Sequence, residues 1–149
     1  MTREVYAFVK GLGLRGKCLD VGSFDVNGSV RYLFEDYTGM DMRAGPNVDV
    51  VHDACSLPFG NDTFDTVTCL EMLEHCKYPF IAVDEMVRVL KPGGVLVVTA
   101  PSIGFPEHNY PSDYWRFTTE AMKVLAEGLV DVNVVKDKDH VYLVARRSV

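Results

Sequence analysis

The stretch Gly16–Gly28, with the sequence GKCLDVGSFDVNG, decides the fold of this chain. It opens with a short apolar run, Cys18–Val21, that predicts a strand, followed by a loop with two glycines. The next segment, Ser29–Glu35, has apolar residues on one side and predicts a helix. A strand, glycine loop and helix in this order direct backbone N–H groups at the polar end of a ligand. The spacing departs from G-x-G-x-x-G, because Phe24 stands where a second glycine would be. The loop alone therefore fits an ordinary turn as well as a nucleotide site.

Composition is that of one globular domain. The chain has 149 residues, of which 48% are hydrophobic and 24% charged, and we expect a single domain over residues 1–149. A net charge of −6 disfavours nucleic-acid binding, because phosphate recognition needs a basic surface. No apolar run approaches the length of a membrane span, and the first residues do not resemble a secretory signal. We therefore expect a cytoplasmic protein without a membrane span, and a homodimer is compatible with the sequence.

The cysteines do not indicate a disulfide framework or a metal site. Cys18, Cys55, Cys69 and Cys76 contain no C-x-x-C pair, and three of them lie in or beside strand-like runs. We expect reduced thiols that pack in the core. A zinc site through Cys69, His75 and Cys76 is disfavoured, because adjacent ligands converge poorly on one ion. The expectation is that no metal is bound.

The rest of the chain alternates helix-like and strand-like segments. Apolar periodicity, with proline and glycine at the boundaries, predicts helices over Met1–Lys10 and Pro79–Leu90, and one from Thr118 or Thr119 to Glu127. Further strands are predicted over Tyr37–Met40, Val48–Val51, Phe64–Leu70, Val95–Ala100, Asp131–Lys136 and Val141–Ala145. The link between the last two strands is too short for a parallel crossover, so they must form an antiparallel hairpin. The pattern predicts an α/β fold with a mainly parallel sheet and one terminal hairpin.

Three acids stand at or just after the ends of successive predicted strands. They are Asp20, Asp41 and Asp53, and ligands bind at the carboxyl edge of open α/β sheets. Asp41 follows Asp20 at about the spacing of an acid that binds a ribose diol. Asp53, with Ala54 beside it, is placed to accept the exocyclic amine of an adenine. Three acids in this arrangement favour a nucleoside-containing cofactor over three unrelated loop residues.

With these motifs together, the chain resembles the class I S-adenosylmethionine-dependent methyltransferases, of a small type without a separate substrate domain. The resemblance rests on LDVGSFDVNG (Leu19–Gly28), GMD (Gly39–Asp41), HDACSLPFGNDTFDTV (His52–Val67), EMLEH (Glu71–His75) and VLKPGGVLVVTAP (Val89–Pro101). The segment Pro101–Met122 also resembles methyltransferases of polysaccharide and glycan biosynthesis. The family implies a Rossmann-like three-layer sandwich with a seven-stranded, mostly parallel sheet and an antiparallel terminal strand.

The resemblance implies S-adenosyl-L-methionine as the cofactor and assigns residues to it. Asp20 and Gly22 would lie at the methionine part and Asp41 at the ribose. Asp53 and Ala54 would contact the adenine, and Leu70 or Glu71 the methionine end. We include the neighbouring Ser23 and Met42 in the same site. Phe24 fits either a cation–π contact with the sulfonium or plain loop packing.

The acceptor is expected after the fifth predicted strand, where Pro101–Thr118 is too long for a simple connection. The Asn/Asp-Pro-Pro-Tyr loop of many amino-group methyltransferases is absent after Leu70, so an oxygen acceptor is the default. We expect a small-molecule or glycan acceptor, with His108 as general base and Asp113 as the second candidate. The residues expected to contact the acceptor are His75, Tyr110, Tyr114, Trp115 and Arg116. Instead of contacting the acceptor, His75 could pack beside a helix and Trp115 could lie in a core.

Three functions fit the sequence. An O-methyltransferase explains the most motifs. A cofactor-binding module that depends on a partner for catalysis is the second, because little of the chain precedes the first strand to cover a site. A nicotinamide-dependent oxidoreductase is the third, and it is disfavoured by the glycine spacing and the terminal hairpin.

Overall fold

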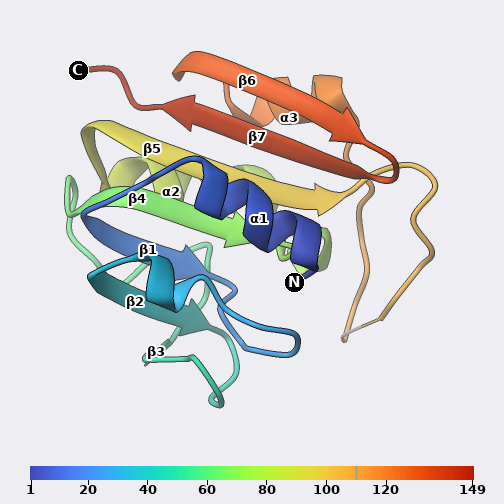
Figure 1. The fold of residues 1–149 in the computed structure, drawn as a ribbon, viewed down its shortest axis with the longest axis horizontal. Helices are drawn as coiled ribbons and strands as arrows, with labels where there is room; N and C mark the ends of the chain where they lie inside the picture. The colour runs from blue at the N-terminus through green and yellow to red at the C-terminus, as the bar shows by residue number, and fades with distance from the viewer. Residues whose placement is uncertain (110) are drawn as a thin grey trace.

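The computed structural model describes residues 1–109 and 111–149, and a seven-stranded sheet runs through its centre (Figure 1). The spatial order of the strands is β3-β2-β1-β4-β5-β7-β6. The strands are β1 (Lys17–Val21), β2 (Asp36–Asp41), β3 (Val50–Val51), β4 (Phe64–Leu70), β5 (Leu90–Pro101), β6 (Val130–Asp137) and β7 (His140–Arg146). Strands β1 to β5 pair in parallel, whereas β7 runs antiparallel to both β5 and β6. The expected Rossmann-like sheet with an antiparallel terminal strand is confirmed.

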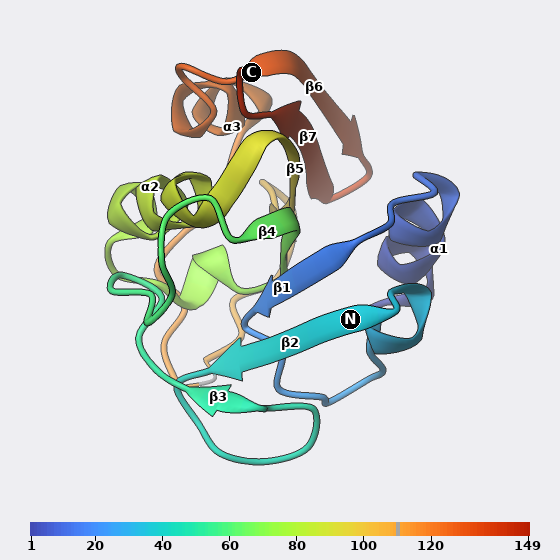
Figure 2. The same cartoon turned by 90° about the vertical axis from the view of Figure 1, so that its left-hand side faces the viewer.

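Helices cover both faces of this sheet, which gives three layers (Figure 2). The helices are α1 (Arg3–Gly11), α2 (Pro79–Val89) and α3 (Thr119–Leu125), with 3-10 turns η1 (Arg31–Leu33) and η2 (Leu73–His75). Helix α2 begins with Pro79, whose missing N–H costs nothing in a first turn. Helix α3 begins after Thr118, whose hydroxyl accepts the N–H of Ala121 at 3.0 Å. Of the two candidate caps, Thr118 is therefore the one used.

The core has two apolar layers, one on each side of β4 and β5. One layer joins Leu96 and Val98 of β5 to Val83 and Met86 of α2, all of them buried. The other joins the opposite face to α1 through residues such as Val5. Because both faces are covered, the part of β5 from Val95 to Ala100 is buried and almost continuously apolar, as parallel central strands are. The four cysteines are all free thiols, as expected.

The segment after the glycine loop corrects one expectation. Ser29–Glu35 does not form an α-helix, and only the three-residue turn η1 lies within it. The Asp25 carboxylate accepts the N–H of Gly28 at 2.6 Å and closes a turn, so the loop extends further along the chain than expected. Strand β2 then begins only three residues after η1. Helix α1, rather than a helix after β1, covers this face of the sheet (Figure 2).

The C-terminal hairpin is confirmed in detail. Asp137 of β6 pairs with His140 of β7, so Lys138 and Asp139 form a two-residue turn. Lys138 has a φ of 54°, in the left-handed region that such turns require. The hairpin places His140 beside Pro101 at the end of β5. Within residues 1–109 and 111–149, no helix has the length and apolar character needed to cross a bilayer.

Candidate active site

The carboxyl ends of β1, β2, β4 and β5 point to one edge of the sheet, and the long loop after β5 lies along that edge (Figure 1). Most of the residues expected in the site leave from these strand ends. They fall into a group at β1, β2 and β3 and a second group at β4, β5 and β7. The first contains the residues expected at the cofactor, and the second most of those expected at the acceptor.

The glycine loop is held against the end of β2. Gly22 has a φ of +85°, which only glycine adopts without strain. Its N–H and that of Ser23 both donate to the carbonyl of Met40, at 2.8 and 3.0 Å. The N–H of Phe24 donates to the Asp41 carboxylate at 3.2 Å. The loop therefore turns sharply over the carboxylate that the sequence assigns to a ribose.

Asp41 lies at the end of β2 with its side chain 14% exposed. Its second carboxylate oxygen accepts the backbone N–H of Arg43 at 3.0 Å. The guanidinium of Arg43 lies 4.2 Å from the centre of the Phe24 ring. Phe24 thus contacts a cation belonging to the protein itself. The same ring face could receive another cation if Arg43 moved away.

Asp20 differs from the other two acids, because its carboxylate lies inside the sheet. It is 5% exposed and accepts hydroxyl hydrogen bonds from Tyr37 of β2 and Thr68 of β4. Burial raises the pKa of Asp20, and the two hydroxyl donors partly oppose that rise. Asp20 therefore joins β1 to both of its neighbours through a buried carboxylate.

The remaining residues of the first group vary in exposure. Asp53 is exposed, and its carboxylate accepts the N–H of Cys55 at 2.8 Å. Ala54 beside it is buried. The hydroxyl of Ser23 donates to the carbonyl of Asn47 at 2.8 Å, so it holds the loop instead of facing solvent. Met42 is 70% exposed.

At the end of β4, the chain turns outward through Glu71. This residue has a φ of 56°, and its N–H still donates to Thr99 of β5 at 2.9 Å. Its carboxylate lies 2.7 Å from Nε2 of His140 on β7. The Glu71 carboxylate raises the pKa of His140 to about 9, from an ordinary value of 6.5. An ion pair between β4 and β7 therefore borders the site where the methionine end was expected.

Next to it, three side chains converge from two loops. Oε2 of Glu74 lies 3.6 Å from Nε2 of His75 and 3.6 Å from Nε2 of His108. Glu74 is 1% exposed, whereas the two histidines are partly exposed. Burial, together with the nearby Glu71 carboxylate, raises the pKa of Glu74 to about 8. The two imidazole rings lie at 84° to each other, with their centres 4.9 Å apart. Two imidazoles and a buried carboxylate therefore face a common point.

The loop after β5 is fixed by one ion pair. Arg116 binds both carboxylate oxygens of Asp113, each at 2.6 Å, and also donates to the carbonyls of Phe105, Pro106 and Trp115. Asp113 in turn accepts the backbone N–H of His108 at 2.7 Å. Arg116 holds the pKa of Asp113 well below its usual range. Asp113 is thus an ionised, fully bonded carboxylate, which makes it a poor general base. Its contacts fix the position of His108 instead.

Two aromatic residues of this loop, Tyr114 and Trp115, lie at the surface. Trp115 is 43% exposed, and its indole N–H donates to the carbonyl of Cys76 at 2.8 Å. The alternative that places Trp115 in a core is therefore wrong. Tyr114 is 48% exposed, and its N–H donates to the carbonyl of Glu74 at 2.7 Å. Tyr110, also expected at the acceptor, lies outside the described residues.

Two residues of this region were not singled out from the sequence. Glu74 lies in the EMLEH segment, where its spacing from Glu71 and His75 could have marked it. His140 gave no such signal, because only the hairpin register brings it to Glu71. His75 was expected near a substrate, and the structure places it beside Glu74 and His108. Cys69, which belongs to the disfavoured zinc set with His75 and Cys76, is fully buried in the core.

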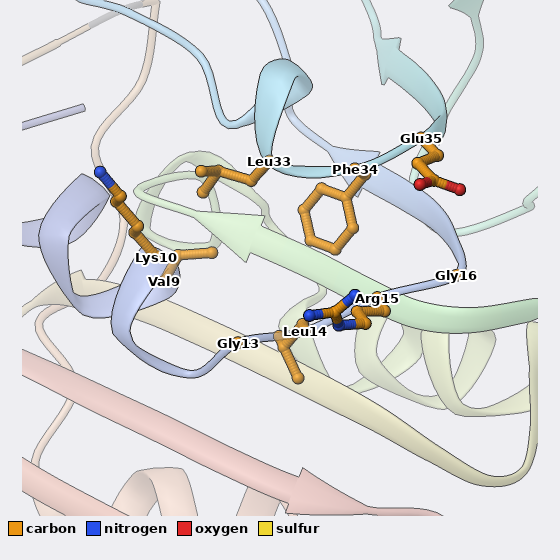
Figure 3. A pocket seen from close by; sticks show the side chains of 9 residues that line it. All are labelled: Val9, Lys10, Gly13, Leu14, Arg15, Gly16, Leu33, Phe34 and Glu35. Atoms are coloured by element: carbon orange, nitrogen blue, oxygen red, sulfur yellow. The ribbon is translucent and has the colours of Figure 1, made fainter.

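A separate hollow of about 360 Å³ lies at the opposite edge of the sheet (Figure 3). It is lined by the C-terminal turn of α1, the loop before β1 and the residues before β2. Val9, Leu33 and Phe34 give it an apolar wall, and Arg15 extends across its rim (Figure 3). None of the residues expected in the active site lines it. It is therefore distinct from the site at the carboxyl edge.

A family model described as a methyltransferase domain matches residues 19–98, which is more than half of the chain. The chain belongs to this methyltransferase family. The match begins in β1 and ends in β5, so it includes the glycine loop, Asp41, Asp53 and the EMLEH segment. Membership confirms the enzyme class and the cofactor, S-adenosylmethionine, that the sequence motifs indicated. The nicotinamide-dependent and non-catalytic alternatives gain no support from it.

Curated relatives match the methyltransferase chain over shorter segments. A demethylmenaquinone methyltransferase of Renibacterium salmoninarum is 46% identical over 57 residues, covering 38% of this chain and 24% of that protein. The phthiotriol/phenolphthiotriol dimycocerosates methyltransferase 1 of Mycobacterium ulcerans is 43% identical over 77 residues, covering 42% and 28%. The matches thus span about a quarter of each relative. Their names refer to quinone and lipid substrates, and neither refers to a glycan.

Solved structures share the whole fold at low sequence identity. An S-adenosylmethionine-dependent methyltransferase of Thermotoga maritima aligns with a TM-score of 0.78 and 18% identity, covering 96% of this chain and 87% of its own. Phosphoethanolamine N-methyltransferase 2 of Haemonchus contortus, solved with S-adenosyl-L-methionine, aligns with a TM-score of 0.77 and 17% identity, covering 98% and 52%. These alignments establish that the fold is the methyltransferase fold.

Proposed function

We propose that the chain is one catalytic domain that transfers the methyl group of S-adenosylmethionine to an oxygen of a small hydroxylated acceptor. The observation that supports this proposal best is the convergence of Glu74, His75 and His108 at the carboxyl edge. These are three groups that can take up or share a proton, and they lie at the same edge as Asp41 and Asp53. Donor and acceptor chemistry would then occupy neighbouring parts of one edge.

The donor side is built by β1, β2 and β3. In this proposal the Asp41 carboxylate accepts both ribose hydroxyls, in place of its contact with Arg43. Asp53 and Ala54 bind the adenine, and the loop from Gly22 to Phe24 follows the methionine part, with Met42 at its border. Asp20 supports the donor side indirectly: its carboxylate accepts hydrogen bonds from Tyr37 and Thr68 and so holds β1 against β2 and β4. Leu70 and Glu71 then close the methionine end.

The acceptor side is built by the loops after β4 and β5. Methyl transfer from a sulfonium is an in-line displacement, so alignment of the two reactants supplies much of the acceleration. A hydroxyl acceptor also gains from losing its proton, because an alkoxide or phenolate is the better nucleophile. His108 is held for this task by Asp113, which is itself fixed by Arg116. Trp115 and Tyr114 lie exposed on the same loop and can stack on the acceptor ring.

A second candidate, methylation at carbon, is favoured by the similarity to demethylmenaquinone methyltransferase over 57 residues. In a hydroxylated aromatic ring, removal of the hydroxyl proton also makes the neighbouring carbon nucleophilic. The same proton-accepting cluster could therefore serve either atom. The expected glycan acceptor is a third member of the same hydroxylated class, and it rests on the resemblance of Pro101–Met122 and on the exposed rings of Tyr114 and Trp115.

The test uses purified protein, S-adenosylmethionine with a ¹³C-labelled methyl group, and panels of phenols, hydroquinones and sugars. We expect acceptor-dependent formation of S-adenosylhomocysteine, and ¹³C NMR separates an O-methyl from a C-methyl product. His108→Ala should lower turnover by about 10²–10⁴-fold and leave cofactor affinity unchanged. Glu107→Gln, an exposed position on the same loop, is the matched control and should keep full activity. Transfer to none of the hydroxylated acceptors, or full activity of His108→Ala, would refute the proposal.

A further inference from the structure

The spacing of Glu74, His75 and His108 differs from that of a hydrogen-bonded cluster. One ligand atom from each of the three residues lies within 4.8 Å of the other two. The distances from Oε2 of Glu74 to the two Nε2 atoms, both 3.6 Å, are longer than ordinary hydrogen bonds. Ligands that bind one ion at about 2.0–2.2 Å stand roughly 3.0–3.5 Å from one another. The two distances from Glu74 are therefore close to the separation of ligands around a shared ion.

Both histidines present the lone pair of Nε2 to this point. Nδ1 of His75 contacts the carbonyl oxygen of Ser112, which can only accept, so Nδ1 carries the proton. Nδ1 of His108 lies 3.3 Å from the Asp113 carboxylate, which also favours a proton on Nδ1. In the neutral form of each ring, Nε2 then carries the lone pair, and it faces Glu74. Histidine ligands of metals are oriented in this way by a carbonyl or carboxylate behind the ring.

Glu74 provides an independent observation. It is 1% exposed, and its Oε1 atom is buried without a hydrogen-bond partner among the described residues. Burying a carboxylate is costly unless a cation or several donors compensate for the lost water. Arg116, a nearby cation, is already bound to both oxygens of Asp113. The carboxylate is thus preorganised for a positive charge that these neighbours do not supply.

We propose that Glu74, His75 and His108 form a binding site for one divalent first-row metal ion, with positions left open for a ligand. Two imidazoles and one carboxylate suit Mn²⁺, Fe²⁺, Co²⁺ or Zn²⁺ better than Mg²⁺ or Ca²⁺, which prefer oxygen ligands alone. The sequence led us to expect no metal. The sequence alone does not indicate this site, because His108 comes near Glu74 only in the folded loop that Asp113 and Arg116 hold in place.

The proposed function gives such an ion a role, and this step rests on that proposal. An acceptor hydroxyl bound at an open position would lose its proton to solvent more easily, because the ion stabilises the oxyanion. The oxygen then attacks the methyl carbon, the carbon–sulfur bond breaks, and its electron pair remains on sulfur as S-adenosylhomocysteine. In this arrangement His108 acts as a ligand and supplies no separate general base.

Metal binding is tested directly on the full chain after treatment with a chelator and its removal. Titration with Mn²⁺, followed by calorimetry and by the loss of the free Mn²⁺ EPR signal, should show one site per chain. The melting temperature should rise on adding Mn²⁺. Glu74→Gln and His75→Gln should each weaken binding by more than about 100-fold, and Glu107→Gln should bind as the unaltered chain does. Circular dichroism checks that each variant is folded.

The outcomes separate this inference from the proposed function. Absence of a stoichiometric site for Mn²⁺ or Zn²⁺, or equal binding by folded Glu74→Gln, would overturn the metal site. Methyl transfer that depends on His108 but is unaffected by the chelator would overturn the role of the ion in the reaction and leave the proposed function standing. One Mn²⁺ per chain without transfer to any hydroxylated acceptor would support the site and count against the function.

Discussion

The ion pair between His140 and Glu71 predicts a stability that depends on pH. The two side chains are 12% and 16% exposed, and their charged atoms lie 2.7 Å apart. The histidine also lies 2.9 Å from Asp139, whose side chain is 42% exposed and therefore contributes less. A rise of the pKa from 6.5 to about 9 corresponds to about 3 kcal/mol of stabilisation when His140 is protonated. We expect His140→Gln to lose this amount.

The sign of the pH dependence follows from the raised pKa. Below pH 6.5, His140 is protonated in both the folded and the unfolded chain, so its full contribution is present. As pH rises towards about 9, the unfolded chain no longer carries this proton and the contribution is progressively lost. The free energy of unfolding of the unaltered chain, relative to His140→Gln, should therefore fall by about 3 kcal/mol across this range.

The assay is urea denaturation of both chains at several pH values between 6 and 9.5. His52→Gln is the matched control, because His52 is exposed and has no carboxylate partner among the described residues. The free energy of unfolding of His52→Gln should equal that of the unaltered chain at every pH. The opposite result is a difference in free energy of unfolding between the unaltered chain and His140→Gln that stays constant or grows with pH. Either behaviour would show that the proposed pairing does not stabilise the fold.

Two further substitutions test the packing around the site. Gly39→Ala places a methyl group against the Asn47 carbonyl and 2.7 Å from the Ser23 hydroxyl, so the free energy of unfolding should fall by about 1–3 kcal/mol. Gly11→Ala meets no atom within 4 Å and should cost nothing measurable by the same denaturation assay. Trp115→Phe removes an exposed hydrogen bond to Cys76, so thermal denaturation should show a loss of only about 0.5–1.5 kcal/mol. A loss as large as that of a core aromatic would contradict the surface position of this ring.

Local sequence patterns were enough for the parts of the fold that packing on both faces determines. Strand β4 has the predicted bounds, and helix α2 begins at Pro79 as expected, because apolar periodicity and proline act locally. The prediction of a helix over Ser29–Glu35 is wrong, and the cause is a local contact that the spacing of apolar residues does not reveal. The Asp25 side chain closes a turn, and the residues left before β2 allow only a 3-10 turn.

The site was less predictable than the fold, because it depends on contacts between distant segments. Asp41 and Asp53 could be chosen from their places after strands. Glu74 and His108 come together only when Arg116 and Asp113 close the loop after β5, a geometry that no spacing in the sequence encodes. Asp113 fits general-base chemistry by residue type alone, and only its pairing with Arg116 shows that it is a positioning group.

The assignment of the donor side to β1, β2 and β3 is the basis of the whole account, and calorimetric titration with S-adenosylhomocysteine tests it most directly. The unaltered chain should bind one molecule, and Asp41→Ala should bind about 1.5–3 kcal/mol more weakly, the scale of a charged hydrogen bond. Circular dichroism should show that the variant is folded. Equal affinity of Asp41→Ala, or no binding by the unaltered chain, would contradict the account.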